Sequence, residues 1–132
     1  MKVCILGHGL SSLTLAKALV NQNIYVELIC QKKNQKISLS RTLGISKSNI
    51  NFFNKNIINI NKLLWKLKKI EIYSDNLKNE KLLNFEKNND QIFSIIKKHE
   101  LNLIIEKDLL KSKYFKKRYF KNVNSFILKD YN

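Results

Sequence analysis

The chain has 132 residues, 44% of them hydrophobic, and a formal charge of +15. That length can bury one hydrophobic core but hardly two, so we expect one domain or part of one. No apolar run reaches the roughly eighteen residues that a membrane-spanning helix needs, and the N-terminus lacks the charged start and small-residue cleavage site of a secretory signal. These exclusions favour a cytoplasmic protein.

The strong positive charge carries little information about function. Almost all of it is lysine, since Arg41 and Arg118 are the two arginines, and lysine, asparagine and isoleucine are abundant together while proline is absent. This joint bias is typical of an A+T-rich genome. Spread lysines usually form a solvated surface. A small basic protein that binds RNA or an acidic membrane surface stays open as an alternative, but nucleic acid is not the expected partner because no arginine-rich or aromatic motif supports it.

The first thirty residues predict a strand, a phosphate-binding turn, a helix and a second strand. An apolar run at Val3–Leu6 leads into Gly7 and Gly9, a helical pattern covers Leu13–Val20, and a second apolar run covers Ile24–Ile29. Free N–H groups at a helix start bind a doubly anionic pyrophosphate, and the glycines let the backbone approach it. We interpret this as a dinucleotide site. The alternative is that the glycines only shape a tight turn.

Two positions depart from the G-x-G-x-x-G pattern of such sites. Ser12 stands where the third glycine would allow close packing, and Cys30 stands where an acidic residue would accept hydrogen bonds from the adenosine ribose. A neutral thiol is a poor acceptor, so the ribose contact is expected to be weakened or moved. Glu27 is interpreted as a tolerated polar position at a strand edge, and the helix is expected to stop at Asn21-Gln22-Asn23, where asparagine tolerates the left-handed conformation that closes a helix. The two cysteines show no metal-ligand spacing.

A polar loop at Gln31–Leu39 leads to Arg41. Arginine is scarce here, and its planar fork can bind a phosphate or a flavin edge in a way that lysine cannot. We therefore treat Arg41 as a candidate cofactor ligand, with an ordinary surface arginine as the alternative. Ser46 is expected to cap a helix over Lys47–Lys55. The segment Asn61–Leu67 predicts a further short helix with its tryptophan in the core.

The second half of the chain predicts a hairpin and a long helix. Strict alternation at Ile70–Tyr73 and an apolar return at Leu82–Phe85 predict paired strands, which mark an insertion in a doubly wound sheet. A helical pattern covers Ser94–Leu110. His99 lies within it and is interpreted as a surface histidine, not an acid–base partner of its neighbour Glu100. The basic, aromatic tail predicts one more strand, at 125–128.

In this order, four motifs resemble the N-terminal part of the flavin-dependent aromatic hydroxylases, most closely those of ubiquinone biosynthesis. GHGLSSLTLAKAL is similar to the family's GxGPAGLxLAxxL, and RTLGIS to its RTxALS. IEIYSD…LLNF resembles its strand pair, and SIIKKHELNLII lies where the family has a YIVENxxLxxxL helix. The first motif is common among flavoproteins, whereas the ordered set is much more specific. Lys97 and Lys98 replace the family's Glu-Asn.

The resemblance implies an FAD-dependent monooxygenase in which NAD(P)H or another reductant reduces the flavin and an aromatic or prenylated phenol is hydroxylated. It implies that Gly7, Gly9 and the N–H groups at positions 10–12 hold the pyrophosphate. Arg41 and Asn102 would reach the flavin side of the cofactor, and Cys30 would lie at the ribose. The residues proposed to bind the cofactor are therefore Gly7, Gly9, Leu10, Ser11, Ser12, Cys30, Arg41 and Asn102, with no metal ligands. A small NAD-binding protein is the remaining alternative, although Cys30 would hold its ribose poorly.

The expected fold is α/β, a Rossmann-like βαβ FAD-binding unit with an inserted hairpin. We expect one partial domain over 1–132, with the βαβ unit at 1–30, a flavin-side loop and helix at 31–68, the hairpin at 69–86, and a helix and basic tail at 94–132. The family continues with a second phosphate loop and a substrate-covering sheet that this sequence does not contain. We therefore expect a truncated or fragmentary product that lacks a convincing catalytic acid or base and binds FAD weakly or not at all. Association with the inner membrane surface or with a multienzyme assembly stays open.

Overall fold

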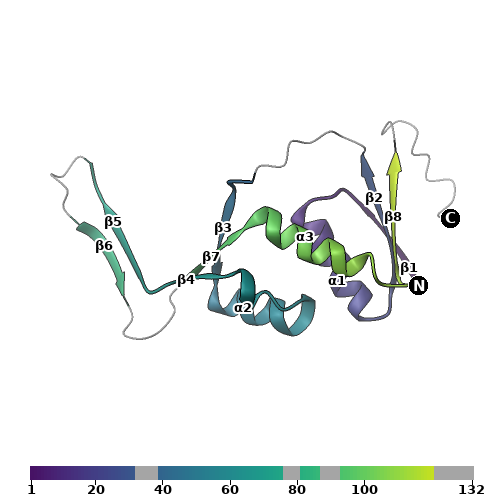
Figure 1. Ribbon diagram of the computed structural model, residues 1–132, viewed down its shortest axis with the longest axis horizontal. Coiled ribbons are helices and arrows are strands. Elements are labelled where there is room, and N and C mark those ends of the chain that lie inside the picture. The colour runs from purple at the N-terminus through teal and green to yellow at the C-terminus, as the bar shows by residue number, and fades with distance from the viewer. Residues whose placement is uncertain (32–38, 76–80, 87–92, 121–132) are drawn as a thin grey trace. The chain divides into compact units, whose positions relative to one another are not determined.

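The computed structural model describes residues 1–31, 39–75, 81–86 and 93–120 (Figure 1). The chain divides into two compact units. Unit 1 combines the two ends of the chain, Met1–Leu39 and Lys98–Asn132, and unit 2 is the intervening segment Ser40–Lys97. Unit 2 is therefore inserted into unit 1 along the sequence.

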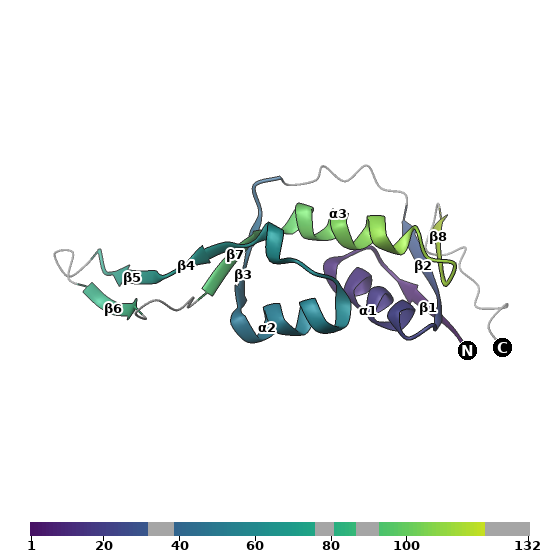
Figure 2. The same cartoon turned by 60° about the horizontal axis from the view of Figure 1, so that its bottom comes forward.

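Unit 1 contains a parallel sheet of strand order β1-β2-β8 with two helices. Its elements are β1 (Lys2–Leu6), α1 (Leu10–Asn21), β2 (Tyr25–Gln31), α3 (Lys98–Leu109) and β8 (Phe115–Phe120). The strands advance in one direction across the sheet, so right-handed crossovers place both helices on the same face. Figure 1 and Figure 2 show α1 and α3 side by side there. This arrangement confirms the predicted α/β fold and its βαβ start.

The core of unit 1 lies between these helices and the sheet. Each helix carries a buried apolar stripe with the spacing of one helical face, and the middle strand adds continuous apolar residues, as expected of a covered parallel strand. The buried residues are Leu13, Ala16 and Val20 of α1, Leu101, Ile105 and Leu109 of α3, and Val26, Leu28 and Cys30 of β2; Ile29 is also buried, on the opposite face of β2. At the edge of this core, Lys17 Nζ lies 2.6 Å from Asp108 Oδ2 and links the two helices.

Helix α1 ends as the sequence predicts. Asn23 has φ of 61°, in the left-handed region. Its N–H donates to the Val20 carbonyl at 2.9 Å, and the N–H of Ile24 donates to the Leu19 carbonyl at 3.1 Å. These two bonds form a Schellman motif in which asparagine takes the place usually held by glycine.

The interpretation of Glu27 as a strand-edge residue is wrong. Strand β2 is the middle strand of the sheet, and the Glu27 side chain is fully buried. Its Oε2 lies 2.8 Å from Lys2 Nζ, and its Oε1 pairs with the Arg118 guanidinium of β8. The sequence pattern at 111–132 indicates a basic, aromatic tail and does not predict β8, the strand that supplies Arg118. The strand expected at 125–128 lies outside the described residues.

Unit 2 contains an antiparallel sheet of strand order β3-β7-β4 and a separate hairpin, β5-β6. The strands are β3 (Thr42–Ser46), β4 (Trp65–Leu67), β5 (Lys69–Tyr73), β6 (Lys81–Glu86) and β7 (Phe93–Lys97). The helical segments are α2 (Lys47–Phe52), the π-helical η1 (Phe53–Ile57) and the 3₁₀ turn η2 (Asn61–Leu63). Ser46 caps α2 as predicted, because its Oγ accepts from the Asn49 N–H at 3.3 Å. The predicted hairpin is confirmed, although residues 76–80 of its connection lie outside the described ranges.

Three expectations for this part of the chain are wrong. The segment Asn61–Leu67 is not a helix, because a 3₁₀ turn leads directly into β4, and Trp65 is 57% exposed. Residues Ser94–Lys97 belong to the middle strand β7, so the helix begins only at Lys98. The His99 side chain in that helix is 17% exposed and is therefore not a surface histidine. In the first two cases, pairing with distant strands overrides the local helical pattern.

Candidate functional site

The turn after β1 uses its two glycines for different purposes. Gly7 has φ of 111°, a conformation that side chains rarely adopt, and a Cβ there would lie 3.3 Å from Ser12 Oγ. Its N–H donates to the Ile29 carbonyl at 2.9 Å, which ties the turn to β2. At Gly9 an added Cβ would meet nothing within 4 Å. Gly7 therefore shapes the turn, whereas Gly9 leaves open space beside the start of α1.

The first turn of α1 can receive an anion. Gly9 is the N-cap and supplies no side chain to bond the first N–H groups, and no acidic residue lies in the first turn. The N–H groups of Leu10, Ser11 and Ser12 therefore meet no capping side chain at the positive end of the helix dipole. A pyrophosphate fits this site because it supplies the missing acceptors.

Cys30 does not supply the usual ribose acceptor. Its thiol is buried and lies 3.9 Å from the Gly7 carbonyl oxygen, to which it donates. Burial raises the pKa of the Cys30 thiol, the charge of Lys117 opposes this rise, and the nearby Glu106 carboxylate adds to it. Cys30 is therefore a neutral thiol at neutral pH.

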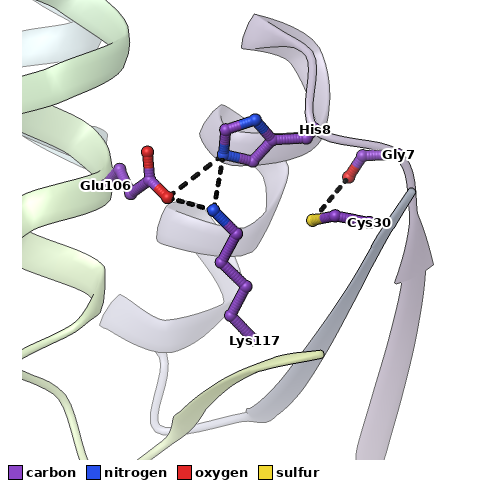
Figure 3. A network of polar contacts seen from close by, with 5 residues as sticks. All are labelled: Gly7, His8, Cys30, Glu106 and Lys117. Atoms are coloured by element: carbon purple, nitrogen blue, oxygen red, sulfur yellow. Dashed lines mark hydrogen bonds and ion pairs between the residues drawn. The ribbon is translucent and has the colours of Figure 1, made fainter. Parts of the chain in front are cut away.

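A cluster of three polar side chains lies at the turn, and we call it the His8 cluster: His8, Glu106 of α3 and Lys117 of β8 (Figure 3). His8 Nε2 lies 3.1 Å from Glu106 Oε1 and 3.0 Å from Lys117 Nζ, and Lys117 also pairs directly with Glu106 Oε1. His8 Nε2 accepts from the lysine when unprotonated and donates to the carboxylate when it bears a proton. The cluster thus joins the turn, α3 and β8.

The cluster shifts the titration of both of its charged members. Burial alone would raise the pKa of Glu106, but hydrogen bonds from Lys117 and His8 outweigh it and lower the pKa. Burial alone would lower the pKa of Lys117, but its bonds to Glu106 and Tyr119 outweigh it and raise the pKa. At neutral pH Glu106 is therefore an anion and Lys117 a cation.

These shifts predict how Glu106 contributes to stability. A carboxylate whose pKa is lowered on folding stabilises the protein above its unfolded pKa, near 4.5, and loses that contribution as the pH falls through its folded value. We expect Glu106→Gln to cost about 1 kcal/mol at pH 7, the scale of a partly screened ion pair, and less at pH 3, which lies below the unfolded pKa. Urea unfolding at both pH values measures this, and an equal cost at both would contradict it.

The remaining predicted ligands lie in different places. Asn102 is half-buried on α3, four residues before Glu106 and hence on the same side of the helix. Within the described ranges, its Oδ1 is a buried atom without a hydrogen-bond partner. Arg41 belongs to unit 2, and its contact with a cofactor stays a prediction. The His8 cluster is not predicted by the sequence motifs, although a histidine between two glycines is a signal that points to this turn.

Two kinds of site are absent from the described residues. No group of three or more His, Cys, Asp or Glu side chains among them is placed to hold a metal ion. In the same ranges, no helix is both long enough and apolar enough to cross a membrane.

No known family model matches this sequence, and no curated protein matches it significantly. Solved structures do resemble it in fold. The p-nitrophenol 4-monooxygenase PnpA from Pseudomonas putida aligns with a TM-score of 0.72 and 12% identity, over 89% of this chain and 32% of its own. PqsL, described as a probable FAD-dependent monooxygenase from Pseudomonas aeruginosa, aligns with a TM-score of 0.70 and 14% identity, over 90% and 32%.

A geranylgeranyl bacteriochlorophyll reductase-like protein from Thermoplasma acidophilum is also similar, with a TM-score of 0.64, 14% identity and coverage of 89% and 29%. Identities this low establish the fold alone. The chain spans about a third of the length of these proteins. It therefore has a mixed α/β fold that resembles the N-terminal part of FAD-dependent monooxygenases.

Proposed function

We propose that this chain is the FAD-binding portion of a flavin-dependent monooxygenase that hydroxylates an aromatic ring. The observation that supports the proposal is the turn at Gly7, whose left-handed glycine and uncapped helix start would suit an anion, on a fold similar to that of such enzymes. Gly9 leaves the space that a diphosphate would fill. FAD, when bound, would supply the oxygen chemistry, and this chain would supply the grip on its diphosphate.

The protein's own groups act in binding and orientation. The N–H groups of Leu10, Ser11 and Ser12 would donate to the diphosphate, and the dipole of α1 favours its charge. Asn102 has a buried oxygen without a partner in the described part of the chain, and a cofactor hydroxyl or N–H group would satisfy it. We place Arg41 on the flavin side because of the RTLGIS motif in which it lies. None of these residues is proposed as a catalytic acid or base.

The finer proposal concerns the substrate. We infer a prenylated phenol of ubiquinone biosynthesis, because the four ordered motifs resemble those hydroxylases most closely. The name of PnpA describes a monooxygenase acting on p-nitrophenol, which supports a phenolic ring as the substrate class. Ring oxidation would require the remaining two thirds of the length seen in these structural relatives, with NAD(P)H or another reductant as the electron source.

An NMR titration of the 132-residue chain tests the binding proposal. Adding FAD or ADP is expected to shift the amide signals of Gly7, Gly9 and Leu10–Ser12 progressively, with weak affinity. Inosine, which lacks a phosphate, serves as the control and is expected to leave these signals in place. If millimolar FAD and ADP both leave the amides of this turn unmoved, the proposed function is wrong.

A further inference from the structure

No acidic residue stands at the end of β2, but the carboxylate of Glu106 contacts His8 in the adjacent turn. Gly7 and His8 are consecutive residues that face two different partners. The Gly7 carbonyl oxygen lies 3.9 Å from Cys30 Sγ, and His8 Nε2 lies 3.1 Å from Glu106 Oε1. Two consecutive residues of the turn therefore contact Cys30 at the end of β2 and Glu106 on α3 (Figure 3).

The two oxygens of Glu106 have different surroundings. Oε1 takes both contacts of the His8 cluster, from His8 and from Lys117, as Figure 3 shows. In the described part of the chain, Oε2 has no such contact, and the side chain keeps 19% of its surface exposed. One oxygen is thus fixed while the other can accept hydrogen bonds, and an ionised carboxylate is the strongest acceptor available to a hydroxyl.

We propose that Glu106 accepts the hydrogen bonds of the adenosine ribose hydroxyls, in the role that Cys30 cannot fill. Lys117 and His8 are its positioning residues, because they hold Oε1 and leave Oε2 to the ligand. The inference rests on the proposed function, since it assumes an adenine dinucleotide at the Gly7 turn. It identifies a ribose contact that comes from α3 instead of β2.

This assignment predicts selectivity at the ribose. A carboxylate binds a hydroxyl, gains nothing from a deoxyribose and repels a ribose phosphate. Hydrogen bonds to a charged group contribute about 1.5–3 kcal/mol, so the 2′-hydroxyl is expected to improve binding by roughly tenfold or more. The chain should therefore prefer ADP to 2′-deoxy-ADP and to adenosine 2′,5′-bisphosphate.

Calorimetric titrations of ADP and 2′-deoxy-ADP test the proposal. The wild-type chain is expected to bind ADP about tenfold more tightly, and Glu106→Met, which removes the acceptor, is expected to bring the two affinities together. Glu106→Gln keeps the shape of the side chain and is expected to narrow the ratio, which covers the case in which Glu106→Met does not fold. Asp108→Asn is the matched control, because it removes a carboxylate of α3 that pairs with Lys17 and should keep the full ratio.

The ratio of the affinities for ADP and 2′-deoxy-ADP distinguishes a ribose contact from a structural role, since a structural defect would weaken the binding of both nucleotides equally. An unchanged ratio in both Glu106 variants would overturn the assignment while nucleotide binding and the proposed function remained intact. Equal binding of the two nucleotides by the wild-type chain would overturn it in the same way. Failure of the wild-type chain to bind either nucleotide would overturn the proposed function and this inference together.

Discussion

Replacing Lys2 and Arg118 together by methionine is expected to lower the free energy of unfolding by about 3–5 kcal/mol, the usual cost of removing the partners of a buried charge. The reason is the position of Glu27, whose side chain is fully buried in the middle strand, whereas those of Lys2 and Arg118 are about half exposed. The double variant leaves the carboxylate in the sheet without these two cations. Removing Glu27 itself costs less, because the two cations can turn toward water.

Urea unfolding of four proteins measures this effect: wild type, Glu27→Met, the double variant, and the triple variant with methionine at all three positions. The triple variant is expected to recover most of the loss, because a buried ion pair replaced by apolar side chains of similar volume is often neutral or stabilising. A triple variant as unstable as the double variant would show that the loss comes from packing of the long side chains and not from the loss of the two ion pairs with Glu27.

The pair Gly7→Val and Gly9→Val is expected to separate folding from ligand binding. At Gly7, with φ of 111°, a branched side chain is strained and its Cβ would crowd Ser12, so a loss of about 1–3 kcal/mol in stability is expected. Gly9 has φ of −83° and open space around it, so valine there avoids strain and is expected to cost only the poorer N-cap, about 0.5–1 kcal/mol. The same valine would fill the space beside the helix start and is expected to weaken ADP binding at least tenfold.

Thermal unfolding and calorimetric titration of each variant check both parts. Ala16→Val, a change in the buried stripe of α1 remote from the turn, serves as the control because it should lower stability without a specific effect on binding. Full ADP affinity in a folded Gly9→Val variant would mean that the nucleotide does not approach the turn at Gly9, which would contradict the proposed site.

The start of unit 1 was predictable because its signals are local. The turn after β1 requires a glycine at position 7, and Asn23 ends a helix in the left-handed region. Strands β1 and β2 are adjacent parallel strands joined by one helix. The strand β8 was not predictable from its own residues. Its basic sequence lacks the alternation of apolar and polar residues that predicts a strand. Its position is set by pairing with β2, a segment far away in the chain.

The same reason explains the gaps in the candidate site. Gly7 and Gly9 are recognised from spacing, because the phosphate chemistry requires them within one turn. Glu106 and Lys117 come from two later elements, and only the packing of α3 and the register of β8 bring them to His8. Glu27 was misjudged because a buried carboxylate is tolerated only where cations pair with it. One of those cations, Arg118, reaches Glu27 only through the pairing of β8 with β2, which the sequence does not reveal.

The insertion of unit 2 within unit 1 has a kinetic consequence. The β2–β8 pairing joins residues about ninety positions apart, such as Val26 and Phe115, so its loop-closure entropy opposes early formation. The two ends of unit 2 are neighbours in its own sheet, where Thr42 lies opposite Lys97. Once unit 2 has folded, its paired ends shorten the loop that β2–β8 pairing must close by more than half. This lowers the entropic free-energy cost of closing the loop by about 1 kcal/mol. We therefore expect unit 2 to fold before the parallel sheet of unit 1, because this order has the lower loop-closure cost.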